Sequence, residues 1–488
     1  MSAKSLSRNS PGRPKSCLAP SGVVGGSAAL RIRPAPCGYS GGGSDRREVP
    51  GVVLIACLLA LILAPAAWAG LDIQHWSTPQ GARVYFVQNH DLPMLDVSVD
   101  FAAGSARDSR KTSGLAQLTR HVMGLGAGPY SERDIAERLA DVGAVLSGRL
   151  DADRAGFSLR SLSSPAERDQ AVSVLAAILA APRFDAAILE REQARVIAAL
   201  EEAATKPESI GEKAFQAALY GEHPYALDES GEVESVRALK REDLAAFHGA
   251  HYRAANMVLA IMGDIRRDEA EALAIQLSRD LPAGVAPPPI PTFTVAERGV
   301  ERVIPHHATQ SHLFMGLPGL KRDDPDYFPL HVGNYILGGG GFDSRLTEAI
   351  RQKKGLAYSV YSYFLPMREL GPFRIGLQTR RSTTREAVET ARAELARYLA
   401  EGPSEAELAQ ARNNLIGGFP LRIDSNRKIL DHLAMIGFYQ LPLDWLDTYS
   451  ARVAAVTRED ILRAFRARVR PEAMSTIIVG GQLEPAAR

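Results

Sequence analysis

A chain of 488 residues is too long for one ordinary hydrophobic core, so two to four domains are expected. Apolar residues make up 45% and charged residues 23% of the sequence, which is typical of a soluble globular protein. The 57 basic and 56 acidic side chains leave a formal net charge of +1, which gives no field that would attract nucleic acid or an anionic membrane.

The N-terminal segment differs from the rest of the chain. Residues 1–50 are rich in Ser, Gly, Pro and Arg without hydrophobic periodicity, and we expect them to form a disordered arm. The apolar run over residues 51–69 follows two arginines and ends in Ala67-Trp68-Ala69. This pattern predicts a secretory signal that is cleaved after Ala69.

Two alternatives to a cleaved signal remain open for this apolar run. One is a membrane anchor, against which Pro65 and the small residues at the end of the run argue. The other is a lipoprotein signal, because the sequence from Leu54 to Cys57 resembles a lipoprotein cleavage box. That box stands early in the run, with most of the apolar residues still to follow, so we favour cleavage after Ala69.

All cysteines of the chain precede the predicted cleavage point: Cys17, Cys37 and Cys57. The exported chain would therefore contain no disulfide, no thiolate metal site and no cysteine nucleophile. Export without disulfides suits a bacterial periplasm, which is the predicted location.

After the signal, the hydrophobic pattern alternates between strands and helices. Ser131 and Asp134 form a predicted capping box, and Ile135, Leu139 and Val142 form an apolar stripe on the helix that it opens. The absence of short βαβ units favours an α+β fold. In chain order, the pattern predicts strands over 82–88 and 95–105, a helix over 114–123, a strand over 154–162, and helices over 167–181 and 189–203.

The chain contains an internal repeat on either side of a proline-rich linker. Five prolines fall within ten positions of residues 281–299, which excludes a helix or a central strand there. Residues 236–264 realign with residues 453–481, so that Met257 matches Met474 and each copy reads as a helix leading into a buried strand. We therefore predict two similar domains, over residues 70–280 and 300–488.

The helix over 114–123 resembles a zinc-binding helix without its zinc chemistry. Helical spacing of i, i+3 and i+4 places Gln117, Arg120 and His121 on one face. In H-x-x-E-H helices, that face carries two imidazole ligands and a carboxylate that activates a metal-bound water. Here the first ligand position is an amide, and the carboxylate position is a guanidinium.

Together these features resemble the pitrilysin-type zinc peptidases, the family of insulin-degrading enzyme and the mitochondrial processing peptidase. The resemblance runs from about Val84 to Gly481 and includes LGGGGFDSRL followed by RQKKGLAYSV, over residues 337–360. It implies that each half is an antiparallel sheet covered by helices. It further implies that two such chains enclose a peptide-sized chamber.

The resemblance also implies which ligand positions are lost. The third zinc ligand of the family, a Glu on a later helix, falls on Ala199. Glu201 and Glu202 sit half a turn or more round the helix from that position. Catalytic zinc needs three good protein donors, and a cation about 4 Å from the dication would repel it by roughly 8 kcal/mol at an effective dielectric constant near 20. We therefore expect no metal and no hydrolysis at His121.

The other histidines do not offer a replacement site. His248 and His251 have helical spacing, but no carboxylate stands at ligand spacing from them, or from the remaining cluster of His306, His307 and His312. The present partner of Arg120 is open at this point, with Glu201 and Glu202 among the acidic candidates.

In the second half, Arg351 and Tyr358 stand seven residues apart. Alone, the pair reads as a solvated helix residue and a half-buried strand residue. The glycines at 338–341 lack the ending of a phosphate-binding loop and predict a tight turn before a helix. The resemblance, however, implies that Arg351 and Tyr358 hold the substrate and stabilise the developing oxyanion.

In paired bacterial members of the family, one subunit carries the zinc and the other supplies such an Arg/Tyr pair. The resemblance therefore implies a non-catalytic, substrate-positioning subunit of a heteromeric zinc peptidase that acts on peptides in the periplasm. Zinc is expected only in the partner subunit. The alternatives are a stand-alone peptide-binding or scaffold protein and, less favoured, an active peptidase with an unusual ligand set.

Overall fold

The computed structural model describes residues 70–282 and 284–481. The predicted arm, signal sequence and cysteines all fall within residues 1–69, outside the described residues. Within the two described ranges, no helix combines the length and the apolar content that crossing a bilayer requires.

The first half of the chain forms a six-stranded sheet in the order β1-β2-β8-β3-β7-β6. Val97 and Val99 of β3 are buried, but the polar residues Asp96, Ser98 and Asp100 beside them are buried as well, so β3 lacks the exposed face that the alternating sequence pattern predicts. The strands are β1 (Gln74–Ser77), β2 (Arg83–Gln88), β3 (Met94–Phe101), β6 (Val145–Leu150), β7 (Ala155–Leu162) and β8 (Met257–Gly263).

The second half repeats this arrangement with one strand fewer, in the order β11-β12-β10-β13-β9. Its strands are β9 (Glu301–Ile304), β10 (Gln310–Leu320), β11 (Ala357–Phe364), β12 (Gly371–Arg380) and β13 (Ser475–Val479). β13 lies between β9 and β10 in the second sheet, just as β8 lies between β2 and β3 in the first. β8 and β13 are the strands that the internal repeat predicted would close each half.

Each sheet contains one parallel pair besides the antiparallel pairs that were expected. β8 pairs parallel with β2 and antiparallel with β3, and β13 pairs parallel with β9 and antiparallel with β10. Consecutive strands such as β2 and β3 run in opposite directions, so a strand inserted between them must be parallel to one of the two. Each sheet therefore has one parallel pair because its last strand in the sequence lies between two strands that run in opposite directions.

Helices cover the sheets in both halves, which confirms the predicted α+β class. The predicted capping box is present, because Ser131 accepts from the Asp134 N–H and the Asp134 carboxylate accepts from the Ser131 N–H. The first-half helices are α2 (Leu115–Met123), α3 (Glu132–Asp141), α4 (Pro165–Ala180), α5 (Ala186–Ala203), α6 (Pro207–Tyr220), α7 (Val233–Ala238), α8 (Arg241–His251) and α9 (Arg267–Ser278). The second-half helices are α10 (Tyr327–Asn334), α11 (Thr384–Glu401), α12 (Glu405–Gly418), α13 (Asn426–Tyr439), α14 (Trp445–Ala455) and α15 (Arg458–Arg468), and a small β4–β5 pair (Gly126–Ala127, Tyr130–Ser131) follows α2.

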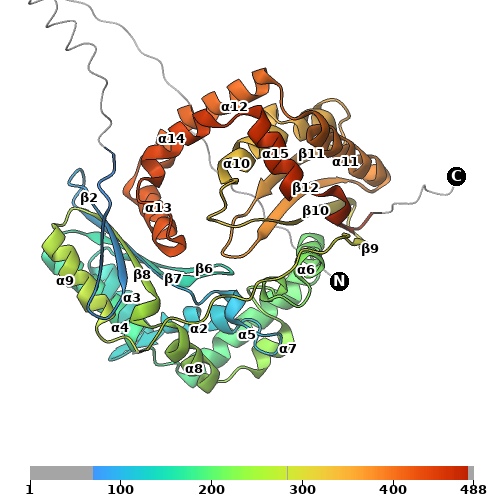
Figure 1. Ribbon diagram of the computed structural model, residues 1–488. Coiled ribbons are helices and arrows are strands. Elements are labelled where there is room, and N and C mark those ends of the chain that lie inside the picture. The colour runs from blue at the N-terminus through green and yellow to red at the C-terminus, as the bar shows by residue number, and fades with distance from the viewer. Residues whose placement is uncertain (1–69, 283, 482–488) are drawn as a thin grey trace, which may run out of the picture. The chain divides into compact units, whose positions relative to one another are not determined.

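The two halves exchange one helix each. α6 packs against β10 and β13 of the second sheet, and α13 packs against β2, β3 and β8 of the first (Figure 1). Both contacts are apolar: Phe215 of α6 is buried with Phe314 of β10, and Leu433 of α13 is buried with Met262 of β8. The exchange joins the described residues of both halves into one compact unit.

Small residues allow the exchanged helices to approach the sheets closely. A Cβ atom at Gly211 of α6 would overlap the Phe314 ring, and a Cβ atom at Gly437 of α13 would lie 2.6 Å from the Tyr85 ring. The described residues of the predicted linker, 281–299, belong to no helix or strand. They run between α9 and β9.

We expect Gly211→Ala to lower the free energy of unfolding by about 1–3 kcal/mol, because the added methyl group overpacks the seam between α6 and β10. Gly249→Ala is the matched control, since Gly249 also lies in a helix but a Cβ atom added there would meet no other atom within 4 Å. The control should gain about 0.5–1 kcal/mol from helix propensity. Urea unfolding measures both values, and equal effects of the two substitutions would contradict the close packing of α6.

Candidate functional site

A buried carboxylate positions the N-terminus of α2. Asp108 Oδ2 accepts from the Gly114 N–H at 2.9 Å, and its Oδ1 accepts from the Ala116 N–H at 3.0 Å. These bonds satisfy amide groups that have no partner within the helix. Gly114 precedes the helix with a φ of +94°, a conformation that favours glycine.

The three motif residues of α2 lie on its half-exposed side. Gln117, Arg120 and His121 are all partly exposed, whereas Leu118 and Val122 between and beyond them are buried. The amphipathic pattern of α2 therefore turns the motif positions away from the core, as the spacing predicts.

His121 pairs with a carboxylate that the sequence analysis did not identify. Its Nε2 lies 2.9 Å from Oε2 of Glu192 on α5. The Glu192 side chain is only 3% exposed, and it also accepts from Arg191 at 2.6 Å and from Arg195 at 2.9 Å. Glu192 is thus the centre of a charge network that joins α2 to α5.

The predicted third-ligand position lies on the same helix as Glu192. Ala199 follows Glu192 by seven residues, which is about two helical turns, so both residues share one side of α5. Ala199 is exposed and offers no donor. Glu201 and Glu202 are also exposed, and Glu202 pairs with Lys206 at 2.8 Å. The spacing of seven residues is the signal that would have singled out Glu192.

Arg120 lies across the edge strand β6 and does not pair with an acidic neighbour. Its guanidinium occupies the space that a side chain at Gly148 would fill. Among the described residues it makes no ion pair, so neither Glu201 nor Glu202 is its partner. Burial lowers the pKa of Arg120, and the nearby Tyr252 hydroxyl offsets this in part. The substituted motif therefore presents a half-buried cation beside His121.

This donor set does not fit a catalytic zinc ion. His121 supplies one imidazole, and both oxygens of its carboxylate neighbour Glu192 are occupied by hydrogen bonds from His121 and from arginine donors. Zinc requires three protein donors and an open position, and nearby guanidinium groups oppose a dication. Within residues 70–282 and 284–481, no group of three or more His, Cys, Asp or Glu side chains has a metal-binding arrangement.

The other histidines that the sequence offered as ligands lie beside aromatic rings or backbone carbonyl oxygens: His248, His251, His306 and His307. His248 is buried and lies 2.8 Å from the Leu179 carbonyl oxygen. His251 packs against Phe247, and burial lowers its pKa to about 4, with smaller contributions from neighbouring arginines. His306 Nε2 lies 3.0 Å from the Thr205 carbonyl oxygen, and the His307 ring stands 6.3 Å from that of His306.

In the second half, the Arg351 guanidinium lies over two aromatic rings. Its guanidinium carbon lies 4.8 Å from the centre of the Tyr358 ring and 4.6 Å from the centre of the Phe342 ring. Tyr358 is 84% exposed and Phe342 is 66% exposed, so the stack projects into solvent. Phe342 was missed by the sequence analysis, although it directly follows the glycine run. Gly341, with a φ of +64°, marks the turn predicted there.

The stack borders a small cavity at the seam between the halves. Tyr358 of β11 lines about 170 Å³ together with His312 of β10 and Glu208 of α6. Burial lowers the pKa of His312, with Glu208 opposing this effect. Among the described residues, no hydrogen bond or ion pair joins the α2 motif to Arg351 or Tyr358. The structure thus places the two predicted sets in separate local environments.

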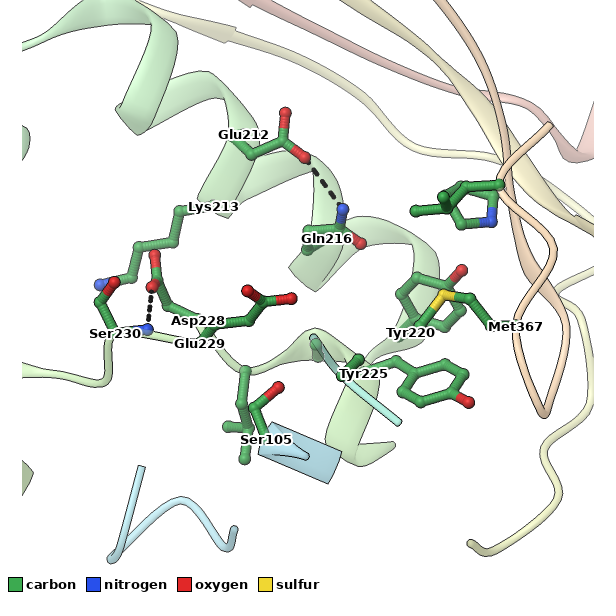
Figure 2. Close-up of a pocket in the computed structure, with 15 residues that line it drawn as sticks. Ser105, Glu212, Lys213, Gln216, Tyr220, Tyr225, Asp228, Glu229, Ser230 and Met367 are labelled. Carbon is green, nitrogen blue, oxygen red and sulfur yellow. Dashed lines mark hydrogen bonds between the residues drawn. The ribbon is translucent and has the colours of Figure 1, made fainter. Parts of the chain in front are cut away.

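A second cavity, of about 280 Å³, contains none of the predicted site residues. Figure 2 shows Glu212 and Gln216 of α6 on one side of it, and Asp228 and Glu229 of the following loop on another. Several of the polar groups are paired, with each other or with residues outside the cavity such as Glu232, which pairs with Lys213. Gln216 donates to Glu212 at 2.9 Å, and Asp228 accepts from the Ser230 N–H at 2.8 Å. The cavity is acidic, and nothing in it resembles a nucleophile–base pair.

Comparisons with known proteins agree with this fold and with the substituted motif. Residues 83–230 match the family model described as insulinase (peptidase family M16), and residues 238–415 match the model described as peptidase M16 inactive domain. The crystal structure of a peptidase M16 inactive domain from Pseudomonas fluorescens is 35% identical with a TM-score of 0.81, and the match covers 84% of this chain and 98% of that one. The fold is that of a zinc peptidase, but the site lacks the side chains that would bind the catalytic zinc.

The chain belongs to the insulinase (M16, pitrilysin-type) peptidase family and is an inactive member of it. A protein named non-peptidase homolog YmxG from Helicobacter pylori is 26% identical, over 84% of this chain and 93% of its own length. The structure of a protease from Helicobacter pylori, 16% identical, shares the fold with a TM-score of 0.79 over 84% of this chain and 99% of that one.

We expect Glu192→Gln to lower the free energy of unfolding by about 1–3 kcal/mol at pH 7, because the arginines and His121 lose a charged acceptor. Burial alone would raise the pKa of Glu192, but hydrogen bonds from His121 and Arg191 outweigh it and lower that pKa. The stabilisation is therefore present above the pKa of the unfolded chain, ~4.3, and is lost as the pH falls through the lower folded value.

Urea unfolding between pH 7 and pH 3 measures this difference. Glu201→Gln, at an exposed position of the same helix, is the control and should change stability little at any pH. A loss for Glu192→Gln that does not shrink at low pH would contradict the charge network.

Proposed function

We propose that this chain is the non-catalytic, substrate-positioning subunit of a heteromeric zinc peptidase. Two features support the proposal together: a motif helix that lacks the donors for zinc, and an Arg/Tyr pair in which Arg351 is partly exposed and Tyr358 is exposed. On this proposal the chain holds no zinc of its own, and a relative with an intact H-x-x-E-H helix supplies the metal.

The geometry of Arg351 carries the proposal. Its guanidinium lies against the rings of Phe342 and Tyr358, and its N–H groups make no hydrogen bond with another described residue. Among the described residues, no carboxylate pairs with Arg351, so its charge is free to act on a bound peptide. The Arg351 guanidinium and the Tyr358 hydroxyl could both donate to a peptide carbonyl as it gains negative charge in the transition state.

A scaffold role without any part in catalysis is the second candidate. It is favoured by the structural similarity to a chain of Complex III2 from Candida albicans, which is 17% identical with a TM-score of 0.70 over 84% of this chain. A pure scaffold has no use for an exposed Arg/Tyr donor pair, so the first proposal explains more of the structure.

Co-expression with a zinc-bearing relative tests the proposal. We expect the purified single chain to cleave no peptide and the pair to be active. Arg351→Ala should lower the kcat of the pair by about 10²-fold, because removal of one oxyanion donor has an effect of that order, and Tyr358→Phe should lower it in the same direction.

Arg381→Ala, at an exposed arginine in the same half, is the matched control and should leave turnover unchanged. Pair formation is measured in parallel by size-exclusion chromatography, so that lost assembly is not mistaken for lost catalysis. Unchanged turnover in both the Arg351 and Tyr358 variants would remove the assisting role and leave the scaffold.

We also propose that the chain acts in the periplasm after cleavage of the signal following Ala69. N-terminal sequencing of the protein recovered from a bacterial periplasmic fraction should begin at Gly70. Recovery of the chain in the membrane fraction, with the apolar run still attached, would favour the membrane anchor instead.

A further inference from the structure

Three arginines converge on a cavity of about 300 Å³ at the seam between the halves. Arg83 comes from β2 and Arg107 from the turn that follows β3, whereas Arg368 comes from the connection between β11 and β12. Prolines of the linker, Pro287 and Pro289, complete the wall. Segments from both halves and from the linker thus meet around one cavity.

None of the three guanidiniums is neutralised by an ion pair within the described part of the chain. Arg83 donates to the Gly437 carbonyl at 3.2 Å, and Arg368 donates to the Phe438 carbonyl at 2.7 Å. Carbonyl oxygens carry no formal charge, so these bonds position the guanidiniums without cancelling their charge. Each group also keeps N–H donors that these bonds do not use.

Arg107 is held in the same way. Its Nε donates to the Ala102 carbonyl at 3.2 Å, and its Nη1 donates to the Pro288 carbonyl at 2.6 Å. The second bond ties the proline-rich linker to the first half. Burial lowers the pKa values of Arg107 and Arg83, and the positive charge of Arg368 lowers both further. Arg368 therefore lies close enough to interact with each of the other two cations, while the charge of Asp153 opposes the lowering of the pKa of Arg107.

The one carboxylate that lines the cavity is already engaged. Asp153 is 2% exposed and accepts from the Tyr225 hydroxyl, from the Tyr439 hydroxyl at 2.8 Å and from the Arg368 backbone N–H at 2.7 Å. It contributes at most one negative charge against three positive charges. The cavity lining therefore carries a net charge of at least two positive units.

We propose that this cavity binds a small oxyanion with two negative charges, of the phosphate or dicarboxylate class. Planar guanidinium forks match the oxygens of both groups, and a dianion neutralises the excess charge of the lining. The volume suits a small molecule, and the apolar surfaces of Ile290 and Phe438 accommodate its carbon portion. The site is separate from Arg351 and Tyr358 and needs no partner subunit.

Occupancy of the cavity would join the halves more firmly. An anion that contacts Arg83, Arg107 and Arg368 at once bridges β2, the first-half turn and the second-half connection. A ligand that binds only this folded arrangement raises the free energy of unfolding by mass action. The apparent Tm of the protein should therefore rise with the concentration of the anion.

Isothermal titration calorimetry with the purified chain tests the site, using sodium phosphate and disodium succinate as separate probes and sodium chloride at matched ionic strength as the salt control. We expect saturable, one-site binding of at least one dianion and none of chloride. Saturation with phosphate alone assigns a phosphate ligand, whereas saturation with succinate alone assigns a dicarboxylate.

Arg107→Gln and Arg83→Gln should each weaken the binding at least tenfold, and each variant is first checked for native circular dichroism without ligand. Arg302→Gln, at an exposed arginine of β9, removes the same charge elsewhere and should bind as the wild type does. Absence of saturable binding for both dianions, or equal affinity in folded Arg107, Arg83 and Arg302 variants, would overturn the proposal.

Discussion

The reciprocal exchange of α6 and α13 is the constraint on which the rest of the structure depends. Each helix belongs to one half of the chain and buries its apolar side on the sheet of the other. Burial of a side chain such as Leu433 or Phe215 contributes about 1.5–3 kcal/mol, so several such residues on each helix outweigh any single polar contact across the seam. Asp153 adds directional hydrogen bonds to this apolar contact, because it accepts from donors of both halves.

The helix α2 shows that this fold can be kept without the zinc-binding residues. α2 keeps its capping by Asp108 and its buried apolar side, so its place in the fold does not require a metal. The charge that zinc would have supplied is replaced locally. Arginines from α5 neutralise Glu192, and Glu192 in turn holds His121. The side of α2 that would perform hydrolysis has become part of a helix–helix contact.

Much of the fold could be predicted from the sequence, because it is encoded in local periodicity. The strand around Val97 and the capping box at Ser131 depend on residues that are neighbours in the sequence. The repeat that pairs Met257 with Met474 is visible when two segments of the same sequence are compared. Glu192 was not predicted because the family resemblance places the third zinc ligand seven residues further along the chain. The arginine cavity could not be predicted at all, since Arg83, Arg107 and Arg368 come from segments that only the tertiary fold brings together.

The exchanged helices also bear on how the polypeptide acquires its structure. The sheet that contains Met262 remains uncovered on one side until residues 426–439 have been synthesised and can pack on it. The N-terminal half therefore cannot complete its core during synthesis, and its final contacts join residues far apart along the chain. Such long-range closure delays collapse to the native state. A polypeptide with this property therefore stays incompletely folded for longer after its synthesis.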